Sequence, residues 1–246
     1  MNIRTFEDYR RLSTNTAREI LRIVLEKQDA VLCLATGETP LGAYAELVRQ
    51  AKMQRINFSG IRFVSLDEWV GIPPSNPGSC HYFLHRHLFQ PLQIKPEQIY
   101  LFDGMAEDTQ TTCMLMNEHV QKLGGIDLML LGIGMNGHIG FNEPGTSPEL
   151  EAHVAALDEI TQTTGQKYFQ TETLLKAGMT LGIRQIMESR NVLLMANGIR
   201  KAEILQAALE GPVTASVPAS ILQQHPQSLI LLDAGAASKL GSGSKA

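Results

Sequence analysis

Aromatic side chains, cysteine and excess charge are all scarce in this chain of 246 residues. Aromatics make up 6% of it, three residues are Cys, and 21 Lys and Arg stand against 25 Asp and Glu. The net charge of −4 disfavours a broad nucleic-acid or membrane surface, because both partners are anionic. No apolar run reaches the roughly 20 residues of a membrane-spanning helix. We therefore expect no nucleic-acid and no membrane partner, which leaves chemistry on a small molecule open.

The cysteines and the first residues bear on the cellular compartment. Cys33, Cys80 and Cys113 are odd in number and widely spaced, which disfavours a disulfide framework or a zinc ribbon. Residues 1–7 lack the apolar core of a signal peptide. We expect a cytoplasmic protein. Residues 241–246, rich in Gly and Ser, are interpreted as a flexible tail or a cloning remnant.

Short apolar runs alternate with longer amphipathic segments along the chain. The expected strands are 30–35, 61–66, 98–102, 126–131, 178–181, 191–196 and 228–232. The expected helices are 7–27, 40–53, 79–90, 106–123, 183–188 and 200–210. This alternation predicts an α/β fold, a doubly wound and mostly parallel Rossmann-like sheet with helices on both faces. We expect a single domain over residues 1–240. In such sheets ligands bind beyond the carboxyl ends of the strands.

The first such strand end carries Thr-Gly-Glu-Thr-Pro at 36–40. Thr39 is expected to cap the next helix, with Pro40 at its first position. A glycine turn that leads into a helix offers free backbone N–H groups to a phosphate. An ordinary capped turn is the alternative, and the charge of Glu38 opposes a phosphate there.

The second strand end carries two adjacent acids, Asp67 and Glu68. One of them is a candidate general base, and their proximity is expected to raise one pKa. The alternative is a capping acid next to a surface acid, with Trp69 packed on the sheet edge.

The third strand end is a glycine-rich loop over residues 131–145. Gly132, Gly134 and Gly137 match the dinucleotide-binding pattern G-x-G-x-x-G, and Asp158 lies at a suitable distance downstream. That pattern requires a helix at its third glycine, and the glycines and proline at 140–145 disfavour one. The same loop carries Asn136, His138 and Glu143, which suggest a proton-transferring histidine oriented by a carboxylate and an amide. A histidine that merely fills the loop is the alternative.

Two further groups of basic residues were considered. Lys201 follows the strand 191–196 at the start of a helix, where the helix dipole disfavours a cation, so it suggests an anionic ligand. A solvated lysine is the alternative. His81, His85 and His87 have a spacing seen in metal sites, but no fourth ligand is evident, and half-buried histidines of an amphipathic helix explain them better.

In this order the four strand ends resemble those of the glucosamine-6-phosphate deaminase/isomerase family, which shares its fold with 6-phosphogluconolactonases. The similarity extends over residues 30–232 and is strongest at 35–44, 66–71 and 131–145. Asn-Glu-Pro-Gly at 142–145, shortly after His138, favours the deaminase branch. The resemblance implies isomerisation and deamination of a phosphorylated amino sugar, without a metal or another cofactor.

The resemblance also implies roles for individual residues. Asp67 matches the carboxylate that moves a proton between C1 and C2 of the sugar. His138 matches the residue that opens the sugar ring, and Glu143 matches the one that orients it. The matching substrate- and phosphate-binding positions are Thr36, Gly37, Glu38, Thr39, Gly137, Lys167 and Lys201.

Three positions depart from the family pattern. Asn136 stands where the family has an aspartate, so it orients without stabilising an imidazolium charge. Glu38 stands at a frequent glycine, and Lys167 at an arginine, which loses bidentate geometry. The Asn-Gly-His variant is similar to a galactosamine-6-phosphate isomerase/deaminase-like subgroup and suggests a galacto-configured substrate.

Two other functions remain open on the same fold, a 6-phosphogluconolactonase-like hydrolase and a non-catalytic sugar-phosphate sensor. The sequence does not decide between a monomer and a homo-oligomer.

Overall fold

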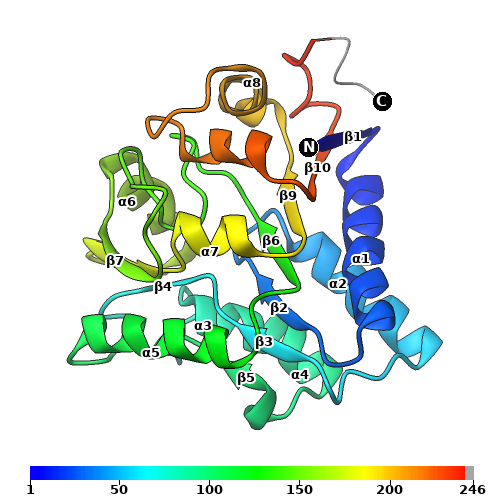
Figure 1. The fold of residues 1–246 in the computed structure, drawn as a ribbon, viewed down its shortest axis with the longest axis vertical. Helices are drawn as coiled ribbons and strands as arrows, with labels where there is room; N and C mark the ends of the chain where they lie inside the picture. The colour runs from blue at the N-terminus through cyan, green and yellow to red at the C-terminus, as the bar shows by residue number, and fades with distance from the viewer. Residues whose placement is uncertain (242–246) are drawn as a thin grey trace.

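Seven parallel strands form the central sheet of the protein, which this computed structural model describes for residues 1–241 (Figure 1). Their spatial order is β1-β10-β9-β6-β2-β3-β5. The bounds are β1 Asn2–Phe6, β10 Ser228–Asp233, β9 Val192–Ala196, β6 Leu128–Leu131, β2 Val31–Leu34, β3 Arg62–Val64 and β5 Ile99–Tyr100. The predicted mostly parallel α/β sheet is confirmed. Residues 242–246 of the predicted tail lie outside the described residues.

Helices cover both faces of this sheet because strand side chains alternate between the faces. Leu32 and Leu34 of β2 pack with α1 (Tyr9–Glu26), α2 (Leu41–Gln54) and the segment of α3 (Cys80–Leu84). Val31 and Cys33 of the same strand face the opposite cluster. That cluster includes residues of α5 (Thr109–Lys122), α7 (Ile183–Glu188), α8 (Ala202–Glu210) and the 3-10 turn Pro218–Gln224.

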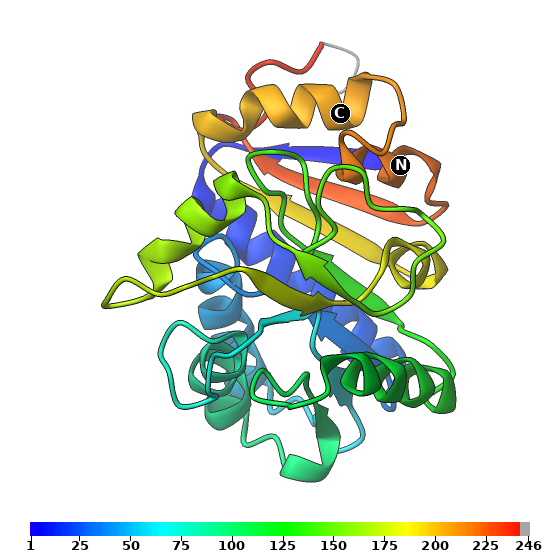
Figure 2. The same cartoon turned by 90° about the vertical axis from the view of Figure 1, so that its left-hand side faces the viewer.

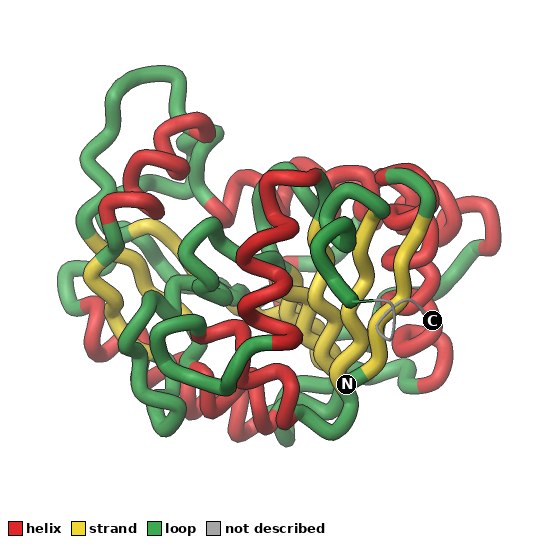
Figure 3. Tube along the Cα trace, turned by 90° about the horizontal axis from the view of Figure 1, so that it is seen from above, coloured by secondary structure: helices red, strands yellow, loops and turns green. Residues whose placement is uncertain are grey.

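The view from above shows the strands of the central sheet lying between the two sets of helices (Figure 3). Short segments complete the helical part of the described chain. They are the π-helical turn His85–Phe89, α4 Gln90–Leu92, α6 Glu159–Gly165 and the 3-10 turns Pro96–Gln98, Gln166–Tyr168 and Ile199–Lys201. No helix within residues 1–241 is long and apolar enough to span a bilayer.

A second, antiparallel sheet of three strands lies beside the first. Its order is β4 (Asp67–Trp69), β8 (Ala177–Thr180) and β7 (His153–Ala156). The prediction that 178–181 belongs to the parallel sheet is therefore wrong. Gly178 pairs with Trp69, and a Cβ on Gly178 would lie 2.3 Å from the Phe141 ring, so this strand packs on the loop after β6.

The first and last strands of the described chain, β1 and β10, are neighbours in the central sheet. The predicted first helix, 7–27, begins at Tyr9 in the structure, after the side chain of Asp8 accepts a hydrogen bond from the backbone N–H of Arg11. The residues before it form β1, which the sequence analysis missed. β1 pairs in parallel with β10, with Asn2 opposite Leu229.

The topology brings the four unusual strand ends together. They follow β9, β6, β2 and β3, which are neighbours in the sheet and run in the same direction. The chain order reverses between β2 and β6, and ligands of open α/β sheets bind at such a reversal. The loops after β2 and β6 therefore border the expected site.

Candidate active site

The turn at 36–40 connects the end of β2 to α2. Gly37 has φ +104°, a left-handed conformation that favours glycine. The predicted cap is wrong, because Pro40 occupies the N-cap position without a side-chain hydrogen bond. Thr39 instead donates its hydroxyl hydrogen bond to Asn197 Oδ1, 3.1 Å away at the end of β9. The turn is thus tied to the neighbouring strand end.

Lys167 lies against this turn although it is distant in sequence. Its Nζ is 2.6 Å from Glu38 Oε2. The Lys167 ammonium also lies 5.0 Å from the ring centroid of Tyr168. The two departures from the family pattern, Glu38 and Lys167, are therefore in direct contact.

Asp67 begins β4 and its side chain is buried. Burial raises the pKa of this carboxyl to about 6, while a hydrogen bond from Cys80 and the charge of His138 lower it. Cys80 Sγ donates to Asp67 Oδ1 at 3.4 Å and accepts from the Thr36 hydroxyl at 3.2 Å. A carboxylate whose pKa is near neutrality suits the transfer of a proton in both directions.

Glu68 has a different role from its neighbour. Its carboxylate accepts hydrogen bonds from three backbone N–H groups, of Trp69, Cys80 and His81. Burial raises its pKa to about 7, and the charge of Asp67 contributes less than burial does. Loss of solvent, and not the predicted proximity of the two acids, is the main cause of the raised pKa at both Asp67 and Glu68. Glu68 holds the start of α3 against β4.

His138 is held on one side of its ring by two partners. Nδ1 lies 3.3 Å from Glu143 Oε2 and 3.0 Å from the Thr161 hydroxyl. The ring covers Gly134, where a Cβ would lie 2.4 Å from Nε2, so this position requires glycine. The predicted pairing of His138 with Glu143 is present.

Glu143 connects this histidine to Asn136. Asn136 Nδ2 donates to Glu143 Oε2 at 2.7 Å, and Asn136 Oδ1 accepts from the backbone N–H of His138 at 3.2 Å. Burial raises the pKa of Glu143, but hydrogen bonds and charge from His138, Thr161 and Asn136 bring it below its usual value. Asn136 therefore acts on the imidazole through Glu143 and the backbone.

Lys201 is the last of the predicted site residues. It is the last residue of the turn Ile199–Lys201 and the N-cap of α8, and its Nζ donates to the carbonyl of Ile133 at 2.6 Å. Burial, with smaller contributions from the charges of Lys167 and Arg200, lowers its pKa to about 8. This contact joins the strand ends of β9 and β6.

The loop around Gly137 lacks the helix that the dinucleotide-binding pattern requires. The residues after Gly137 form turns, so the expectation that no helix begins at the third glycine is confirmed. Gly137 has φ +88°, and a Cβ would lie 2.9 Å from Val217. Asp158, the suggested ribose ligand, caps α6 by accepting from the Ile160 N–H at 2.8 Å.

Two of the three clustered histidines, His81 of α3 and His85 of the following π-helical turn, stack on each other. Their ring centroids lie 4.6 Å apart, and burial lowers the pKa of both. Within residues 1–241 no group of three or more His, Cys, Asp and Glu is arranged to hold a metal ion.

Sequence reasoning missed three residues of the site, Cys80, Thr161 and Tyr168. Each reaches it from a segment remote in sequence: Cys80 from α3, Thr161 from α6, and Tyr168 from the turn Gln166–Tyr168. Thr161 and Cys80 carried no motif. Only their contacts with His138 and Asp67 reveal them.

The chain is similar to characterised proteins over nearly its whole length. The family model described as glucosamine-6-phosphate isomerases/6-phosphogluconolactonase matches residues 7–231. A glucosamine-6-phosphate deaminase of Thermoanaerobacter pseudethanolicus is 40% identical over 94% of this chain and 92% of its own length. Glucosamine-6-phosphate deaminase 2 of Bacillus subtilis is 40% identical over 99% of both.

Two solved structures have the same fold. One is a monomeric glucosamine-6-phosphate deaminase, with a TM-score of 0.95 and 39% identity over 97% of this chain and 100% of that chain. The other is a 6-phosphogluconolactonase of Trypanosoma brucei, with a TM-score of 0.76 and 22% identity over 98% of each. The second likeness concerns the fold alone.

Proposed function

Since the chain belongs to the family of glucosamine-6-phosphate isomerases and 6-phosphogluconolactonases, we propose that it isomerises and deaminates a 2-amino-2-deoxyhexose 6-phosphate. The products are a ketohexose 6-phosphate and ammonia. The observation that carries this proposal is the convergence of a buried carboxylate, Asp67, and an oriented histidine, His138, beyond the ends of β3 and β6, the two strands that flank β2.

In this reaction His138 moves the proton that opens the sugar ring, while Glu143 and Thr161 hold its Nδ1. Asp67 takes the proton from C2 and delivers it to C1, so that a C2 imine forms. Water adds to this imine, and ammonia leaves. One carboxylate suffices because the substrate stays in place between the two steps.

The substrate's phosphate binds at the turn 36–40 and the two lysines. The N-terminus of α2, a helix of 14 residues, carries the positive end of the helix dipole. Lys167 and Lys201 supply the positive charge, while Thr36, Thr39 and Gly37 shape the turn. Gly137 keeps the loop after β6 close to Val217, which fixes Asn136 and His138 beside it.

Glucosamine 6-phosphate is the favoured substrate over its galacto epimer. The suggestion of a galacto-configured substrate rested on Asn136 alone, whereas the two relatives that are 40% identical bear the name glucosamine-6-phosphate deaminase. The lactonase alternative has only fold-level support at 22% identity. We place the reaction in the cytoplasm.

A substrate panel tests the proposal. The protein is incubated with glucosamine 6-phosphate, galactosamine 6-phosphate and 6-phosphogluconolactone, and ammonia, ketose phosphate and acid release are followed. We expect ammonia and ketose phosphate in equal amounts from glucosamine 6-phosphate. Asp67→Asn should lower kcat by at least about 100-fold, since general-base catalysis contributes that much. No ammonia from either amino sugar would refute the proposal, and lactone hydrolysis alone would select the lactonase function.

A further inference from the structure

Lys167, a proposed phosphate ligand beside the turn 36–40, is already paired with a carboxylate of that turn. Lys167 Nζ lies 2.6 Å from Glu38 Oε2, and Glu38 is the residue that follows Gly37. Both side chains are partly exposed, 40% for Lys167 and 65% for Glu38. A phosphate group bound at this turn would therefore compete with the Glu38 carboxylate for the ammonium group of Lys167.

Tyr168 occupies the turn from the same side. Its hydroxyl interacts with the backbone of Glu38, and a Cβ on Gly37 would lie 2.9 Å from it. Lys167 lies over the same ring. The segment Gln166–Tyr168 thus supplies both a cation and a hydroxyl to the turn. Glu38 of the turn supplies the carboxylate that pairs with this cation.

The opposite side of the turn is fixed. The Tyr9 hydroxyl donates to the carbonyl of Thr39 at 2.9 Å and accepts from the N–H of Gly42 at 2.9 Å. In contrast, the chain around α6 and the residues after it projects from the body of the molecule (Figure 2). We therefore expect a ligand at the turn to displace the side chain of Glu38 and to leave the turn itself in place.

We propose that Glu38 is an affinity-determining residue, an internal anion that a substrate's phosphate displaces from Lys167. This inference rests on the proposed sugar-phosphate function. The displaced carboxylate returns to water easily because it is largely exposed. Exposed ion pairs change equilibrium constants by up to about fivefold. This exchange of Glu38 for phosphate at Lys167 therefore weakens phosphate binding by up to that factor.

The alternative role for Glu38 is to promote phosphate binding. If Glu38 held Lys167 ready for the phosphate, removal of its charge would weaken binding. The exchange predicts tighter binding instead. Glu38→Gln decides between them, because it removes the charge and keeps the size of the side chain.

The experiment measures binding of inorganic phosphate by calorimetry and the KM for glucosamine 6-phosphate. We expect Glu38→Gln to lower both constants by about twofold to fivefold. The matched control is Glu188→Gln, which removes an exposed acid paired with Arg184 at 3.0 Å on α7. It should change neither constant. Unchanged or weaker phosphate binding by Glu38→Gln would overturn the proposal.

A second background tests whether Lys167 is the shared cation. In Lys167→Met, Glu38→Gln has no ammonium group to release, so its gain in phosphate affinity should disappear. An equal gain in both backgrounds would mean that Glu38 repels phosphate directly, and the exchange would be wrong. Because calorimetry needs no turnover, loss of the proposed function and failure of this inference give different results: the first is a substrate panel without ammonia, the second an unchanged phosphate affinity.

Discussion

At the scale of single residues, burial of Asp67 raises its pKa, which suits proton transfer but lowers the stability of the fold. A buried carboxylate loses hydration, which disfavours its charged form. Its partners, the Cys80 thiol and the charge of His138, offset only part of that loss, since the pKa remains raised from 3.8 to about 6. The proposed base is therefore kept at a cost in folding free energy.

Asp67→Asn should stabilise the fold at neutral pH. Because the pKa is raised in the fold, stability is greatest below the unfolded pKa and is lost as pH rises through about 6. A neutral amide avoids that loss, so we expect a gain on the order of 2 kcal/mol in unfolding free energy at pH 8. Urea unfolding at pH 8 and pH 4 checks this, with the gain vanishing near pH 4. An exposed control, Asp108→Asn at the α5 N-cap, should show no such gain.

The thiol of Cys80 should tune the acidic limb of the activity profile. It donates to Asp67 at 3.4 Å and lowers that pKa, so kcat/KM should fall as pH drops through about 6. Cys80→Ala removes the donor and should move this limb to higher pH. Cys80→Ser keeps a donor and should restore the wild-type profile. The measurement is kcat/KM for glucosamine 6-phosphate against pH, and identical limbs in all three proteins would remove Cys80 from this role.

At the scale of elements, the small sheet positions Asp67 through close packing of β8 on the loop after β6. Gly178 leaves room for Phe141, whose ring lies 4.6 Å from that of Trp69. This contact joins β4, which carries Asp67, to the loop that carries His138.

Gly178→Ala should disturb that packing. The new methyl group would lie 2.3 Å from the Phe141 ring, and overpacking of this kind costs about 1–3 kcal/mol. Gly132→Ala is the matched control, since a Cβ there meets nothing within 4 Å. Thermal and urea unfolding of both variants provide the test. Equal stabilities would show that Phe141 moves aside at no cost.

The sequence predicted the buried elements better than the exposed ones. The run 126–131 contains β6, and 191–196 contains β9, because strands covered on both faces are continuous apolar runs. β4 is an Asp-Glu-Trp triplet and carries no such signal. Its strand character comes from pairing with β8.

The candidate site shows the same division. Asp67, His138 and Lys201 follow predicted strands, so the parallel topology alone places them at one edge. Thr161 and Tyr168 belong to a segment whose position depends on tertiary packing. No periodicity in the sequence reports that Tyr168 reaches Gly37.

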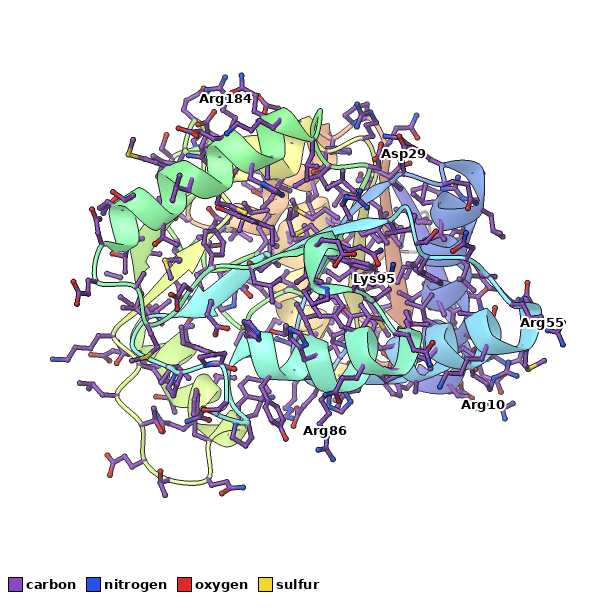
Figure 4. All side chains as sticks on the ribbon, turned by 90° about the horizontal axis from the view of Figure 1, so that it is seen from below. Arg10, Asp29, Arg55, Arg86, Lys95 and Arg184 are labelled. Atoms are coloured by element: carbon purple, nitrogen blue, oxygen red, sulfur yellow. The ribbon has the colours of Figure 1, made fainter. Side chains whose placement is uncertain are left out.

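At the scale of the whole molecule, the charge does not attract the substrate. The net charge is −4, and cations such as Arg55, Arg86 and Arg184 lie at separate places around the body (Figure 4). Under the proposed function, a dianionic sugar phosphate is captured by local groups, chiefly Lys167 and Lys201, after it arrives. Long-range steering would require a field of the opposite sign.

We therefore expect a weak dependence of kcat/KM on ionic strength. Long-range interactions are screened over about 10 Å at 0.1 M salt, whereas direct contacts persist. Between about 0.05 M and 0.2 M salt, kcat/KM for glucosamine 6-phosphate should change by roughly twofold or less. Steady-state rates at constant pH provide the measurement. A tenfold fall in kcat/KM would indicate a positive electrostatic potential around the site that steers the substrate.

The pairing of β1 with β10 has a consequence for how this protein is made. Asn2 lies opposite Leu229, so more than about 200 residues are synthesised between β1 and its partner. Ribosomes add about 5–20 residues per second, so β1 waits for at least about ten seconds before β10 exists. Closing so long a loop also slows the final step of folding. The central strands can assemble earlier during translation, whereas the β1 edge of the sheet is completed only after β10 has been synthesised.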